Sequence, residues 1–152
     1  MIEQLKVVWG EFIRPMMQRP RRLQVAALCY RDVGSERKVL IVTSRGTGRW
    51  IIPKGWPMNG KNSAQAALQE AWEEAGVAKG EAQDQAVGQY RYDKVKATGW
   101  TVPVEALVFP VKVKELSDSF PEADQRKRKW VSAEEAANLV REPELKAILA
   151  NF

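Results

Sequence analysis

Residues 63–75 carry small and apolar side chains at the spacing of an amphipathic helix. These side chains lie three or four positions apart, on what would be one helix face: Ala64, Ala67, Leu68, Ala71 and Ala75. Asn62 or Ser63 can cap the start, because a side-chain oxygen accepts from the free backbone N–H groups. Gly76 favours the left-handed conformation that ends a helix. The pattern therefore predicts a helix from residue 63 to residue 75.

Short apolar or alternating segments predict strands over residues 24–30, 38–43, 50–52, 86–94 and 101–116. Polar turns or loops are predicted over residues 32–37, 45–49, 78–84 and 117–125. Two further helices are predicted over residues 132–140 and 143–149, and Ser132 and Glu135 have the spacing of a capping box. Because strands and helices do not alternate regularly, the order predicts an α/β fold with a mixed sheet between helices.

The first 23 residues are predicted to form an extension, and residues 24–152 a single domain. Apolar residues in the extension fall at helical spacing, which Pro15 and Pro20 interrupt. We expect this segment to pack across the domain or against a partner subunit, so a homodimer is an open alternative. A helix on a membrane surface is the weaker reading, because the basic residues gather at one end.

Composition restricts the chemistry of the 152-residue chain. Its 24 basic and 19 acidic residues give a net charge of +5, which favours anionic partners. The absence of histidine excludes an imidazole base, and the single cysteine excludes an intramolecular disulfide and a Cys/His zinc site. Cys29 lies in an apolar run and is expected to be a buried small hydrophobe. We expect a cytoplasmic protein without a membrane span, because no apolar run approaches ~20 residues.

Three glutamates near the end of the first predicted helix carry the candidate chemistry. Glu70, Glu73 and Glu74 stand at positions i, i+3 and i+4, and residues 63–75 contain no lysine or arginine. Like charges at this spacing repel by roughly 0.2–0.5 kcal/mol per pair, and the negative end of the helix dipole adds to the repulsion. A divalent cation would offset it, and Mg²⁺ prefers carboxylate oxygens. A solvated acidic face is the alternative.

The stretch from Gly55 to Val77 resembles the Nudix box, G-x5-E-x7-R-E-U-x-E-E-x-G-U, in which U is aliphatic. The positions that match in type and spacing are Gly55, Glu70, Ala71, Glu73, Glu74, Gly76 and Val77. Lys61 stands where the family has its first glutamate, and Gln69 stands where it has arginine. The resemblance implies a Nudix α/β/α sandwich with a mixed central sheet. The two departures are expected to weaken metal affinity or slow turnover, because they leave one carboxylate fewer near the metal.

The resemblance also implies metal-dependent hydrolysis of a diphosphate linkage, with Mg²⁺ or Mn²⁺ as the cofactor. Glu70 and Glu74 would be the main metal ligands, with Glu73 and a carbonyl near Gly55 completing the shell. The catalytic base would be one of these helix glutamates or a later carboxylate. The later candidates are Glu105, Glu122 and Asp124.

Two segments outside the box suggest the substrate class. Residues 49–55 resemble the segment before the box in diphosphoinositol polyphosphate and dinucleoside polyphosphate hydrolases, and residues 126–130 resemble their basic segment with tryptophan. By this resemblance the substrate-binding candidates are Arg49, Lys54, Arg126 and Arg128. Taken alone, Lys54 fits a solvated loop equally well, and the basic run fits a solvated turn.

Three functions follow in order of preference. The first is a hydrolase of a phosphorylated small molecule, either a nucleoside polyphosphate or a diphosphoinositol polyphosphate. The second is a Nudix-fold binding or regulatory module with little activity, suggested by Lys61 and Gln69. The third is a nucleic-acid-binding domain, which is disfavoured because the basic residues lack interleaved stacking aromatics.

Overall fold

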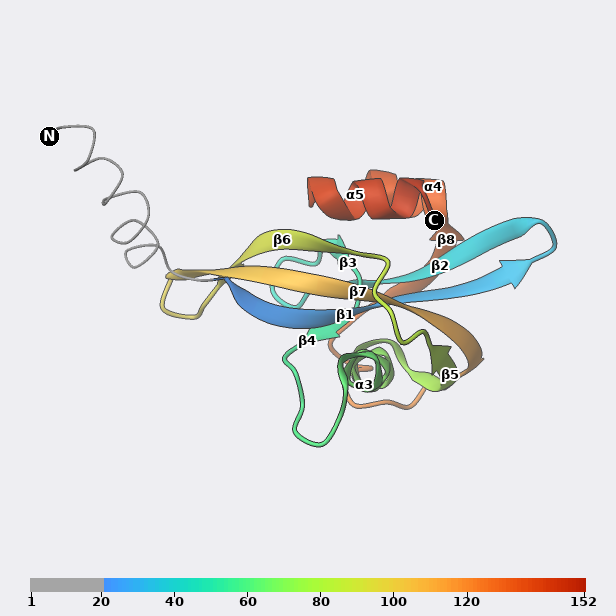
Figure 1. Cartoon of the computed structure of the whole chain (residues 1–152), viewed down its shortest axis with the longest axis horizontal. Helices are drawn as coiled ribbons and strands as arrows, with labels where there is room; N and C mark the ends of the chain where they lie inside the picture. Colours follow the sequence, from blue (N-terminus) through green and yellow to red (C-terminus); the bar gives the residue numbers. More distant parts are fainter. Residues whose placement is uncertain (1–20) are drawn as a thin grey trace, which may run out of the picture.

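The computed structural model describes residues 21–152, in which three helices accompany eight strands (Figure 1). The strands are β1 Arg22–Val33, β2 Glu36–Thr43, β3 Trp50–Ile51, β4 Lys54–Gly55, β5 Val77–Ala82, β6 Gly88–Val95, β7 Thr101–Leu116 and β8 Arg128–Ser132. The helices are α3 Ser63–Ala75, α4 Ala133–Leu139 and α5 Pro143–Ala150. Most of the predicted N-terminal extension lies outside the described residues, and its last two residues, Arg22 and Leu23, open β1.

The sheet is mixed because its central strand β1 has neighbours of both orientations. β1 runs antiparallel to β2 and parallel to β7, with Val25 opposite Leu107. The main path through the sheet is β3-β2-β1-β7-β5, while β4 pairs with β1, β6 with β7 and β8 with β2. Two later strands, β4 and β7, therefore pair with the central strand β1, and β8 then pairs with the outer side of β2.

Helices cover both faces of this sheet, α3 on one and α4 with α5 on the other (Figure 1). Alternate residues of β1 divide between two cores. Val25, Ala27 and Cys29 pack with the alanines of α3, while Ala26 and Leu28 pack towards α4 and α5. A strand that is buried on both faces reads as a continuous apolar run, as β1 does. The predicted α/β sandwich with a mixed central sheet is confirmed.

Helix α3 begins and ends at the residues that the sequence indicates. Asn62 accepts from the N–H of Gln65 at 2.8 Å, and the Gln65 side chain accepts from the Asn62 N–H, which completes a capping box. At the other end Gly76 has φ 76°, and its N–H returns to carbonyls of the last turn. These local contacts fix where the glutamates of α3 stand along the chain.

Three segments differ from the sequence predictions. The turn predicted over residues 32–37 narrows to Gly34 and Ser35, because β1 and β2 pair as far as Val33 and Glu36. Most of residues 78–84 belongs to β5 rather than to a loop, and the pairing with β7 shifts register twice, around Lys79. This irregularity explains why no strand periodicity appears in its sequence. The basic run that also fitted a turn enters β8, where Trp130 lies opposite Leu40 of β2. Within residues 21–152, no helix combines the length and the apolar character that crossing a membrane would require.

Candidate functional site

A cleft of about 440 Å³ opens beside the buried side of α3. Its lining comes from the loop between β2 and β3, from β4, from the C-terminal half of α3, from the end of β6 and from the segment before β8. Three of the predicted site glutamates, Glu70, Glu74 and Glu122, line it. Three of the four predicted cationic residues line it as well. The tertiary structure thus brings most of the predicted site together in one place.

Glu70 occupies a position that only a glycine at residue 55 allows. A Cβ at Gly55 would fall within 2.7 Å of Glu70 Oε2 and closer still to the other carboxyl atoms. The backbone of Gly55 cannot retreat freely, because β4 pairs with β1 and places Gly55 opposite Val25. Gly55 therefore creates the space in which the Glu70 carboxylate meets the backbone of β4.

Glu74, one turn further along α3, is buried and accepts hydrogen bonds at both oxygens. The N–H of Lys54 donates to Oε2 at 2.8 Å, and Arg126 Nη2 donates to Oε1 at 2.7 Å. The same Arg126 nitrogen lies 3.2 Å from Glu122 Oε1, and Arg126 Nη1 donates to the carbonyl of Thr43 at 2.9 Å. One buried guanidinium therefore joins a glutamate of α3 to a glutamate of the loop before β8.

The acidic residues of the cleft repel one another despite this arginine. Burial raises the pKa of Glu70 to about 8, and the negative charges of Glu74, Glu73 and Glu122 contribute further. Burial also raises the pKa of Glu74, against the opposing effect of Arg126. A cation beside Glu70 would stabilise its ionised form.

The residues present fit a divalent cation. Residues 21–152 contain no ready group of three His, Cys, Asp or Glu side chains placed as metal ligands. Mg²⁺, however, commonly binds through one or two carboxylates and completes its shell with water and substrate phosphates. Glu70 and Glu74 supply two carboxylates, and the absence of a side chain at Gly55 lets the first of them lie against the backbone of β4. Glu73 does not line the cleft, and its backbone carbonyl accepts from the N–H of Glu122 at 3.0 Å.

Cationic side chains also line the cleft. Arg49 Nη1 pairs with Glu142 Oε1 at 2.5 Å, and Glu142 is only 8% exposed. The Lys54 ammonium lies 5.0 Å from the ring centroid of Tyr92, and burial lowers the pKa of Lys54 to about 8. Tyr92 in turn donates to Gln24. Sequence reasoning identified Arg49 and Lys54 but missed Glu142, which lies 93 residues from Arg49 and belongs to no motif.

The remaining predicted residues lie elsewhere. Arg128 Nη1 donates to the carbonyls of Ala75 and Ser117 at 2.7 and 2.9 Å, so it contacts the end of α3 rather than the cleft. Glu105 stands in β7 opposite Arg91 of β6, and Asp124 is exposed in the loop before β8. Of the later carboxylates proposed as a base, Glu122 alone lines the cleft.

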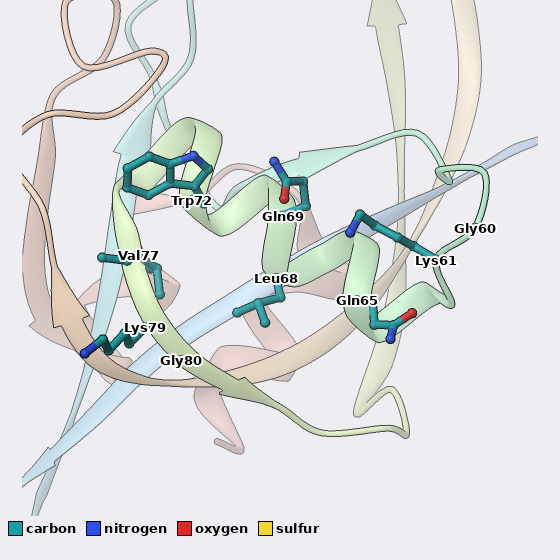
Figure 2. Close-up of a pocket in the computed structure, with 10 residues that line it drawn as sticks. Gly60, Lys61, Gln65, Leu68, Gln69, Trp72, Val77, Lys79 and Gly80 are labelled. Atoms are coloured by element: carbon teal, nitrogen blue, oxygen red, sulfur yellow. The ribbon is translucent and has the colours of Figure 1, made fainter.

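Lys61 and Gln69, where the sequence departs from the box, line a different groove. This groove has a volume of about 520 Å³ and runs between the outer side of α3 and β5, with Trp72 and Lys79 also along it (Figure 2). Neither Lys61 nor Gln69 lines the acidic cleft. Any effect of these two residues on the glutamates must therefore pass through α3 or the loop before it.

Comparison with known proteins agrees with this architecture. Residues 20–152 match the NUDIX domain family. Nudix hydrolase 21, a chloroplastic protein of Arabidopsis thaliana, is 32% identical over 121 residues, which are 78% of this chain and 58% of that protein. Diphosphoinositol polyphosphate phosphohydrolase 3-alpha of Mus musculus is 29% identical over 119 residues, or 77% of this chain and 68% of that one. The chain thus spans little more than half of the plant relative.

A solved structure has the same fold. The crystal structure of an Ap4A hydrolase from C. elegans superposes with a TM-score of 0.67 at 21% identity, covering 88% of this chain and 96% of that one. At this identity the likeness concerns the fold.

Proposed function

Because the chain belongs to the Nudix family, we propose that it hydrolyses a diphosphate linkage in a nucleoside polyphosphate or diphosphoinositol polyphosphate with the help of Mg²⁺ or Mn²⁺. The observation that carries this proposal is the placement of the Glu70 carboxylate against Gly55, one helical turn from Glu74, in a cleft that cationic side chains also line. Glutamates and cationic side chains that line one cleft suit a substrate that brings phosphate oxygens to bound cations.

Each residue of the cleft has a role in this proposal. Glu70 and Glu74 would hold the cation, with the Gly55 carbonyl and Glu73 as further candidates. The bound cation would neutralise phosphate charge and lower the pKa of a bound water. Arg49 and Lys54 would bind phosphate oxygens of the substrate, and Glu142 would hold the Arg49 guanidinium in place.

Arg126 and Glu122 complete the proposed machinery. Arg126 lines the cleft, and hydrogen bonds to Thr43 and Glu74 hold its guanidinium in place. It would therefore donate hydrogen bonds to a substrate phosphate from a fixed position. Glu122 has one oxygen shared between Arg126 and Arg45, at 3.2 and 3.3 Å. Because it is the later carboxylate in the cleft, it is our candidate to accept a proton from water.

The test is phosphate release with Mg²⁺ or Mn²⁺ across nucleoside polyphosphates, dinucleoside polyphosphates, diphosphoinositol polyphosphates and nucleotide sugars. Glu74→Gln should abolish turnover, while Glu134→Gln, on the exposed side of α4, should behave as the wild type. Metal binding to each variant is measured by calorimetry beside the activity. Equal turnover by Glu74→Gln and the native protein would refute the proposed site.

The second candidate is a binding module with little activity. It is favoured by the presence of Lys61 and Gln69 at two positions where the box has a glutamate and an arginine. A folded protein that binds a phosphorylated ligand with metal but shows no turnover would establish it.

The nucleic-acid alternative loses its main support in the structure. Arg126 is buried in ion pairs, Arg128 contacts the end of α3, and the Lys129 ammonium lies 4.6 Å from the Trp50 ring centroid. The four consecutive cations therefore do not present one continuous basic surface. A steep salt dependence of RNA or DNA binding would restore this alternative.

A further inference from the structure

We propose that Trp56 stacks on a nucleobase, so that the cleft takes a nucleoside polyphosphate in preference to a diphosphoinositol polyphosphate. This inference rests on the proposed function and decides between its two substrate classes. It comes from an aromatic side chain, a lysine and a charge balance that the Nudix box does not specify.

Trp56 follows Gly55 directly and lines the same cleft as Glu70 and Glu74. Its exposed fraction is 36%, whereas most large apolar side chains of the described chain are buried. Trp100 is the other tryptophan exposed to this degree among residues 21–152, and it lies in the hairpin between β6 and β7 without lining the cleft. An indole left open beside a phosphate-binding wall offers a flat apolar surface of the kind on which bases stack.

The Lys94 ammonium lies over the ring of the Trp56 indole, 5.1 Å from the ring centroid, and it forms no salt bridge to a carboxylate within residues 21–152. An exposed cation–π contact is weak, and base–aromatic stacking is the stronger of the two interactions. A base that takes the indole face therefore displaces the ammonium, which is then free to meet the phosphate attached to that nucleoside.

The charge balance of the cleft points to the same substrate class. Among the described residues, five cationic and four acidic side chains line it. Three of the five cations, Arg45, Arg49 and Arg126, are already paired with carboxylates. A diphosphoinositol polyphosphate carries on the order of ten negative charges, since each phosphate contributes about −1.5 to −2. With only one more cationic than acidic side chain, the cleft offers little surplus positive charge to such a ligand, whereas a nucleoside polyphosphate combines fewer charges with an aromatic group.

The experiment measures kcat and KM for three substrates: a dinucleoside tetraphosphate, a diphosphoinositol polyphosphate and inorganic tripolyphosphate. The variants are Trp56→Ala, Trp56→Phe and, as the matched control, Trp100→Ala. Binding of a methylene-bridged dinucleoside tetraphosphate, which resists hydrolysis, is measured in parallel by calorimetry. Circular dichroism and thermal unfolding establish that each variant is folded.

Trp56→Ala removes one base-stacking contact. We therefore expect it to raise the KM for the dinucleoside tetraphosphate, and the Kd of the methylene-bridged analogue, about tenfold. Trp56→Phe should recover most of the loss, tripolyphosphate should be affected at least fivefold less, and Trp100→Ala should match the wild type. The role of Trp56 would be overturned if Trp56→Ala raised KM equally for all three substrates. It would also be overturned if Trp56→Ala left the KM for the dinucleoside tetraphosphate unchanged. A wild-type preference for the diphosphoinositol polyphosphate would overturn the substrate assignment.

The proposed function and this inference fail in different ways. If the wild type hydrolyses no member of the wider substrate panel described under the proposed function, the proposed function is wrong. The calorimetric comparison of Trp56→Ala with the wild type still decides whether Trp56 binds the base.

Discussion

The carboxyl group of Glu70 occupies the space in which a side chain at Gly55 would begin. Glu70 stands 15 positions after Gly55 in the sequence, and the two meet because β4 pairs with β1 while α3 packs against both strands. The carboxylate belongs to α3, and the space that it fills is left by the missing side chain of Gly55 in β4. The position of the glutamate therefore depends on the absence of a Cβ as much as on the helix.

Gly55→Ala should displace the Glu70 carboxylate and lower kcat/KM about 100-fold, the loss that a misplacement of about 1 Å can cause. Metal affinity, measured by calorimetry, should fall as well. Gly88→Ala is the matched control, because its added Cβ would meet only the side chain of Ile148, which can move. If Gly55→Ala left kcat/KM and metal affinity unchanged, the position of the Glu70 carboxylate against Gly55 would not matter for function.

Arg126 and Glu74 form the most buried ion pair of the cleft, with side chains 6% and 7% exposed. Arg126→Gln leaves the Glu74 charge without its guanidinium, so we expect the free energy of unfolding to fall by about 3–5 kcal/mol. Arg126→Lys should lose less, since it keeps the charge but not the planar fork that reaches Thr43 and both glutamates. Urea denaturation measures both variants. Equal stability of all three proteins would contradict this role.

Arg128→Gln should lower stability by about 1–3 kcal/mol, because the carbonyls of Ala75 and Ser117 lose their donor at the end of α3. The family resemblance instead predicts that losing Arg128 raises KM for a polyphosphate. Thermal unfolding and substrate kinetics on the same variant separate the two roles. From the contacts we expect the melting temperature to fall; a raised KM at an unchanged melting temperature would assign Arg128 to the substrate.

The double variant Lys61→Glu with Gln69→Arg restores the residues of the Nudix box and should raise activity, by up to about tenfold if the pair acts as supporting contacts do elsewhere. The gain must be transmitted through α3, because both positions line the groove beside β5 (Figure 2). The two single variants are the controls and should gain less than the double variant. Unchanged activity in all three would show that these positions do not affect the glutamates.

Cys29 should be unreactive in the folded protein. Burial raises the pKa of its thiol from 9.0 to about 12, and the charge of Glu74 contributes. A raised pKa favours the neutral thiol in the fold, so its stabilising contribution is complete below pH 9 and is lost as the pH rises towards 12. A thiol reagent at pH 9 should label Cys29 only after denaturant is added. Cys29→Ala should show a shallower loss of stability above pH 9 than the wild type.

Local patterns along the sequence account for much of the fold. The helix over residues 63–75, its cap at Asn62 and its end at Gly76 follow from side-chain spacing and backbone preference within a few residues. The strands β1, β2, β6 and β7 are apparent because burial on one or both faces leaves a periodic or continuous apolar signal. β5 gave no such signal, since its pairing with β7 is interrupted by register shifts.

The sequence by itself determined the helix that carries Glu70 and Glu74, the glycine before it and the family of the domain, because these depend on spacing within one segment. Only the tertiary structure decided that Arg126 bridges Glu74 and Glu122 and that Arg49 pairs with Glu142. It also decided that Arg128 lies outside the cleft. Those contacts depend on how β8 pairs with β2 and how α5 packs on the sheet. No pattern within a single segment encodes the meeting of Arg126 with Glu74 or of Arg49 with Glu142, which lie far apart in sequence.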